Sequence, residues 1–144
     1  MNDINKPGKA GLLGYAGVIP FIMAVILMAS TGPELKKMAL DAFLIYGAVI
    51  LSFLGGIRWG AATTANSDRT HALILSVIPS LWAAVCLLLP SSEVAAWTLM
   101  TGFMLMGLAD WAYPGLGVAS WMRPLRIRLT LLVVAFHLIA IGLI

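Results

Sequence analysis

The sequence predicts an all-α integral membrane protein, a bundle of five transmembrane helices with its N-terminus in the cytoplasm. Of the 144 residues, 61% are hydrophobic and only 10% are charged, whereas a soluble domain carries about 25% charged residues. The chain also contains five apolar segments long enough to cross a hydrocarbon layer, which takes about 20 helical residues. A membrane β-barrel would instead show short strands of alternating polarity.

Each expected helix begins or ends at an identifiable signal. Pro33 suits the first turn of the second helix, and Pro90 ends the third. Ser91 and Ser92 are candidate caps for the fourth helix, and the fifth begins near Pro124. The first helix ends where its apolar run meets the turn sequence STGPE. The expected helices are about 11–30, 34–59, 71–89, 93–111 and 124–144, after a cytoplasmic tail of residues 1–10.

Positive charge predicts the orientation. With five spans, seven Lys and Arg residues fall on one side of the membrane and two, Lys36 and Lys37, on the other. Because Lys and Arg are retained on the cytoplasmic side, we expect the N-terminus in the cytoplasm, or in the matrix if the protein is mitochondrial, and the C-terminus on the opposite side. Trp59, Trp111 and Trp121 fall at the predicted inner interface, where an aromatic belt belongs.

Two pairs of segments suggest an internal repeat. GVIPFIMAV (17–25) is similar to SVIPSLWAAV (76–85), and GGIRWGA (55–61) is similar to GLADWAY (107–113). This pattern predicts two parallel-repeat helix hairpins plus one extra helix, with Pro20 and Pro79 as equivalent kink positions.

The repeat also places Arg58 and Asp110 at equivalent depths near the inner ends of two helices. Charges near the hydrocarbon boundary are costly unless they are paired or reach water. An Arg58–Asp110 ion pair is therefore one hypothesis. The alternatives are that Arg58 reaches the lipid phosphates while Asp110 lies in water, or that both handle a substrate.

Small residues recur every fourth position along the second helix, at Ala48, Ser52, Gly56 and Gly60. Such a groove lets another helix approach closely. Because Arg58 points away from this stripe, we expect the groove to receive the first or the fifth spanning helix.

His137 lies about nine residues beyond Arg128, which places it near the bilayer midplane. A deep ionisable side chain suggests a proton relay, a quinone contact or a haem ligand. The alternative is a neutral imidazole hydrogen-bonded to a neighbouring helix. A bis-histidine haem site would need a second deep histidine, and His71 belongs at an interface.

The segments YGAVILSFLGGIRWG, SVIPSLWAAVCLLL and RPLRIRLTLLVV resemble a known family. It comprises small bacterial membrane proteins whose mitochondrial relatives are called transmembrane protein sixty-nine, catalogued as a domain of unknown function. The resemblance covers nearly the whole chain from about residue 11. It implies an inner-membrane location and carries no catalytic residues.

The sequence contains no phosphate-binding glycine loop, G-x-S-x-G elbow or H-E-x-x-H pair. Together with the short loops, the absence of a soluble domain and the scarcity of buried charge, this favours a non-enzymatic accessory or assembly factor, for which we expect no cofactor and no metal site. Its expected partners are membrane lipids and either another inner-membrane protein or a second copy of the chain, not nucleic acid. The alternative is a small proton-linked transporter or permease that uses Arg58, Asp110 and His137.

Overall fold

The computed structural model describes residues 8–64, 70–113 and 121–144, which form six α-helices and no strand in these ranges. Five segments are long and apolar enough to cross a membrane, since α1 and α2 together make one span. The chain is thus an all-helical membrane protein, as its composition predicts. The helices are α1 (Gly8–Ala16), α2 (Ile19–Ser30), α3 (Pro33–Thr63), α4 (Thr70–Leu87), α5 (Ser92–Ala112) and α6 (Met122–Leu143).

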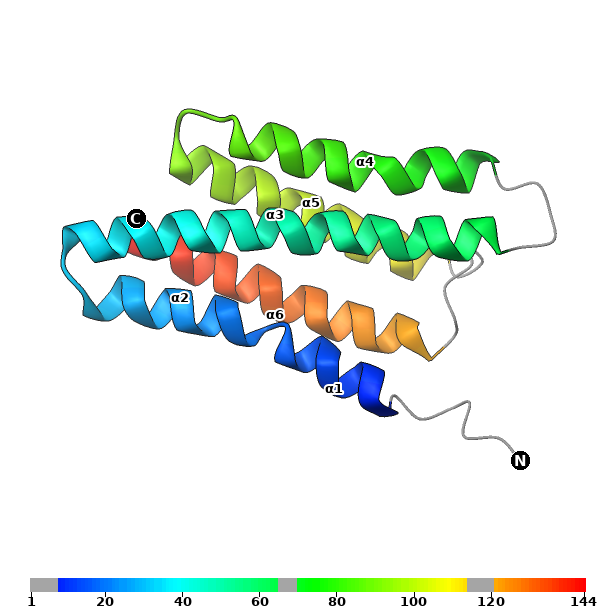
Figure 1. Cartoon of the computed structure of the whole chain (residues 1–144), viewed down its shortest axis with the longest axis horizontal. Helices are drawn as coiled ribbons and strands as arrows, with labels where there is room; N and C mark the ends of the chain where they lie inside the picture. The colour runs from blue at the N-terminus through cyan, green and yellow to red at the C-terminus, as the bar shows by residue number, and fades with distance from the viewer. Residues whose placement is uncertain (1–7, 65–69, 114–120) are drawn as a thin grey trace.

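The spanning segments lie side by side and alternate in direction (Figure 1). The start of α1, the end of α3 and the end of α5 lie at one end of the bundle, and the end of α6 lies at the other. The longest helix, α3, packs against α2, α4 and α5, while α6 packs against α5, α2 and α1. Helices α3 and α5 therefore lie between α4 on one side and α2 and α6 on the other. This arrangement brings charges from different helices within reach of one another.

The first span is interrupted, not merely kinked. Helix α1 ends at Ala16 and α2 begins at Ile19, with a turn at residues 17–18 between them. Pro20 lies in the first turn of α2, where a residue without a backbone N–H is tolerated, and its ring disfavours continuing the helix of α1 through this point. At the break the Phe21 N–H donates to the Val18 carbonyl, and the Gly17 carbonyl accepts a 2.8 Å hydrogen bond from the Tyr46 hydroxyl of α3. Pro79, by contrast, lies inside a continuous α4.

Local signals set the helix starts. Helix α3 begins with Pro33, and Glu34 lies in its first turn, where an acidic side chain favours the helix dipole. Ser91 caps α5 by accepting a hydrogen bond from the Val94 N–H. At 31 residues, α3 is about 46 Å long, longer than the roughly 30 Å hydrocarbon layer, so it extends beyond the layer or tilts within it.

Helices α3 and α4 approach closely at Gly55. A Cβ on Gly55 would lie 2.5 Å from the Ser76 carbonyl oxygen and 3.4 Å from Pro79. About one helical turn from this contact, Ser52 and Ser80 share a 2.9 Å hydrogen bond between their hydroxyls. The expectation that the small-residue groove receives the first or fifth spanning helix is wrong at Ser52, because α4, the third span, lies there.

The buried core runs between the helices and is made of aliphatic and aromatic side chains. Its largest fully buried members come from four helices: Phe21 of α2, Phe43 and Leu51 of α3, Leu99 and Phe103 of α5, and His137 of α6. Cys86 of α4 is also fully buried. Many other large apolar side chains face outward, as a lipid solvent allows.

Candidate functional site

Three charged side chains from three helices meet in the interior near one end of the bundle. Arg58 of α3 donates a 2.7 Å hydrogen bond from Nη2 to Asp110 Oδ1 of α5. Arg126 of α6 donates a 2.8 Å hydrogen bond from Nε to Asp110 Oδ2. None of the three is more than 7% exposed. We call Arg58, Asp110 and Arg126 the charged triad. The structure thus pairs Arg58 with Asp110 and adds a second arginine.

The charged triad carries an excess of positive charge. Arginine stays protonated in proteins, so two guanidinium groups and one carboxylate leave a formal charge of +1. Burying ions costs several kcal/mol each unless their charges and hydrogen bonds are compensated. Among the described residues, Arg58 Nε and both Arg126 Nη atoms are buried without a hydrogen-bond partner. One carboxylate therefore does not satisfy this cluster.

Sequence reasoning missed Arg126, which it counted only as one of the positive residues at the inner side. The helical spacing of the sequence could have identified Arg126 as a buried residue. Arg126 and His137 are eleven residues apart on α6, which brings them to within about 20° of each other around a helix. The buried face of α6 follows this spacing through Arg126, Thr130, Val133, His137 and Ala140. An arginine on the same face as a deep histidine points into the bundle.

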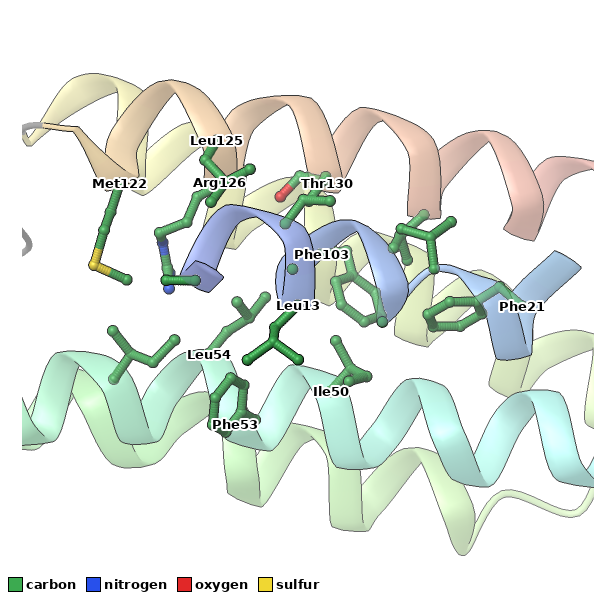
Figure 2. Close-up of a pocket in the computed structure, with 17 residues that line it drawn as sticks. Leu13, Phe21, Ile50, Phe53, Leu54, Phe103, Met122, Leu125, Arg126 and Thr130 are labelled. Carbon is green, nitrogen blue, oxygen red and sulfur yellow. The ribbon is translucent and has the colours of Figure 1, made fainter. Parts of the chain in front are cut away.

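A cavity of about 380 Å³ adjoins Arg126. Figure 2 shows Arg126 and Met122 at one end of the cavity and Phe21 at the other, with Leu13 between them. Its walls come from α1, α2, α3, α5 and α6, and apart from Arg126 and Thr130 they are made of apolar side chains and glycine. The cavity is therefore an apolar space with a guanidinium at one end.

His137 is fully buried away from the charged triad. Its Nδ1 lies 2.8 Å from the Val133 carbonyl oxygen of its own helix, not of a neighbouring helix as the packing hypothesis expects. Ring centroids of Phe43, Phe103 and Phe21 lie 4.7, 5.4 and 5.9 Å from the imidazole. The Nε2 atom has no hydrogen-bond partner among the described residues and faces Gly47 of α3.

The predicted groove on α3 divides into two parts. Ala48 is buried and Ser52 contacts α4. Gly56 and Gly60 are exposed, and a Cβ on either would meet nothing within 4 Å in the described part of the chain. The close helix contact falls instead at Gly55.

The predicted interface tryptophans lie at the charged end of the bundle. Trp59 and Trp111 are exposed, and Trp121 is half-buried beside the start of α6. Arg123 donates a 2.6 Å hydrogen bond from Nη2 to the Trp111 carbonyl. Within residues 8–64, 70–113 and 121–144, no three His, Cys, Asp or Glu side chains form a group that could hold a metal ion.

The fold and the charged triad define the class: a small integral membrane protein of five spans with an internal charge cluster. A family profile described as "Protein of unknown function (DUF3429)" matches residues 6–142. The chain belongs to this family, which confirms the resemblance carried by its sequence motifs.

Two curated relatives are named Transmembrane protein 69. The protein of Xenopus tropicalis is 38% identical over 141 residues, covering 93% of this chain and 53% of the relative. That of Mus musculus is 34% identical over 87 residues, covering 57% of this chain and 35% of the relative. The chain thus spans about half the length of the frog relative and about a third of the mouse relative. No solved structure matches the chain.

Proposed function

We propose that the protein is a non-enzymatic accessory or assembly factor of the inner membrane that packs against another membrane protein. The observation that carries this proposal is the exposed pair Gly56 and Gly60 on α3, which none of the described helices contacts closely. Glycine within a helix costs about 1 kcal/mol relative to alanine. In membranes, G-x-x-x-G spacing offsets this cost by letting a second helix approach closely.

The placement of the polar residues supports this role over proton-linked transport. A transporter using Arg58, Asp110 and His137 needs them along one polar path. Arg58 and Asp110 are held in the charged triad, whereas His137 lies about 16 Å further along α6 than Arg126. Three phenylalanine rings surround His137. Its position favours a packing role.

The distribution of positive charge supports the proposed orientation. Lys9, Arg58, Arg123, Arg126 and Arg128 belong to the bundle end that holds the start of α1 and the end of α3, and Lys36 and Lys37 belong to the opposite end. With positive residues retained inside, the first end faces the bacterial cytoplasm or the mitochondrial matrix.

Purification in a gentle detergent tests the proposed partner. We expect the native chain to elute in a defined assembly with a second membrane protein. The double variant Gly56→Ile/Gly60→Ile should release that protein, because two branched side chains block close helix approach. Val49→Ile is the matched control. Val49 is exposed on the same face of α3 and is already branched, so this change does not block a helix that approaches at the glycines.

Two outcomes contradict the proposal. One is a native chain that is recovered only as a free monomer or a self-oligomer. The other is an assembly that survives the glycine double variant unchanged, because the exposed glycines would then not form the contact.

A further inference from the structure

The charged triad and the adjoining cavity form a site whose chemistry the fold does not complete. Both Nη atoms of Arg126 are buried and lack a partner among the described residues, while its Nε is used by Asp110. In a guanidinium group, the two Nη atoms present a flat face that matches two carboxylate oxygens. Asp110 occupies one edge of Arg126 and leaves this face without a hydrogen-bond partner among the described residues.

The charged triad needs one additional negative charge to be electrically neutral. The charged triad carries a formal +1 in a part of the protein that excludes water. One monovalent anion on Arg126 would leave two positive and two negative groups. A neighbouring carboxylate of this chain does not fill that role in the described ranges, because Asp110 is the acidic group that pairs with Arg126 there.

The cavity indicates what the rest of the ligand must be. Side chains such as Ile50, Phe53 and Leu54 line it, and its volume is about 380 Å³. A water molecule takes about 30 Å³ and a methylene group is of similar size, so the space holds roughly a dozen methylene groups. That is most of one long acyl chain, and it is too small for the two chains of a phospholipid.

We propose that this cavity binds a long-chain fatty acid, with its carboxylate on the Nη1 and Nη2 atoms of Arg126 and its chain directed toward Phe21. The layout in Figure 2 fits this orientation, because Arg126 lies at one end of the cavity and apolar residues follow from there to Phe21. The two Nη atoms are shielded from solvent. An incoming carboxylate reaches them by moving side chains at this end, where Met122 is the flexible, unbranched one.

Direct binding to the full chain tests the site. The protein is placed in phosphatidylcholine nanodiscs and titrated with palmitate, and bound ligand is counted by native mass spectrometry. We expect saturable binding of one palmitate per chain. Hexadecanol has the same tail without a charge. Its affinity should be lower than that of palmitate by a factor of about ten or more, because it loses the paired contact to the guanidinium.

Two variants separate the site from general hydrophobic binding. Arg126→Lys keeps a positive charge for Asp110 but removes the flat two-nitrogen face, so palmitate affinity should fall about tenfold. Arg128→Lys is the matched control, because Arg128 is exposed on the same helix, and its affinity should not change. Leu13→Trp tests the cavity independently. Leu13 lines the cavity and is 72% exposed, so the larger ring should block the chain without disturbing the core.

The outcomes are decisive. The proposal is overturned if hexadecanol and palmitate bind equally, if Arg126→Lys behaves like Arg128→Lys, or if Leu13→Trp leaves palmitate binding unchanged. The proposal is also overturned if phosphatidylglycerol displaces bound palmitate at a lower concentration than added palmitate does, because the bound anion would then be a lipid phosphate. A thermal melt of Leu13→Trp that matches the native chain shows that lost binding is not unfolding.

Discussion

Replacing Asp110 by asparagine should be among the most destabilising conservative changes in this protein. The substitution keeps the shape of the side chain and removes the only charge that the described structure sets against two buried guanidinium groups. A hydrogen bond to a charged group contributes about 1.5–3 kcal/mol, and Asp110 accepts two. Breaking a buried ion pair from one side costs about 3–5 kcal/mol. We therefore expect Asp110→Asn to lower the free energy of unfolding by about 3–5 kcal/mol.

Reversible unfolding by sodium dodecyl sulfate in mixed micelles, followed by tryptophan fluorescence, measures this loss. Asp41→Asn is the control, because Asp41 forms a 2.8 Å ion pair with Lys37 whose side chains are 44% and 75% exposed. Such an exposed pair contributes less than about 1 kcal/mol. Adding Arg126→Met to Asp110→Asn should recover part of the loss, because it removes one uncompensated charge. If Asp110→Asn is as mild as Asp41→Asn, the charged triad does not hold the helices together.

Two further predictions follow from the helix packing and from the charge distribution. Gly55→Ala should destabilise the protein by about 1–3 kcal/mol in the same unfolding assay, because its Cβ would meet the Ser76 carbonyl at 2.5 Å. Gly56→Ala should be neutral or stabilising by up to about 1 kcal/mol, and equal effects of the two changes would refute the α3–α4 contact. For orientation, an impermeant maleimide added to intact bacteria should label Ile144→Cys but not Lys9→Cys, each in a Cys86→Ala background. Labelling of both variants would place residues 9 and 144 in one compartment and refute the predicted topology.

Apolar run length and turn residues were sufficient to predict the spanning helices. The first span ends at Ser30 and α5 begins at Ser92, next to the turn and capping residues that predict these two boundaries, because capping and proline effects act within one turn. The second span runs further than expected, to Thr63 instead of about Trp59. No local stop signal lies between these residues.

Predictions that depended on a partner helix were less successful. The four-residue spacing of small residues selected Gly56, whereas the close contact with α4 falls at Gly55. Periodicity places residues on a face but does not say which neighbour covers it. His137 was recognised as deep, yet its hydrogen-bond partner is the Val133 carbonyl of its own helix and its neighbours are three phenylalanine rings. Those rings come from three different segments of the chain.

The sequence by itself determined that this chain is a bundle of five membrane spans, because the cost of exposing backbone groups to lipid leaves an apolar chain of this kind few alternatives to helices. It also suggested that Arg58 and Asp110 meet, through the repeat that aligns them. Only the tertiary structure decided that Arg126 joins them and that an apolar cavity adjoins its unpaired nitrogens. The physical reason is that compensation of a buried charge depends on distances between helices that are far apart in sequence, and these distances are set by packing.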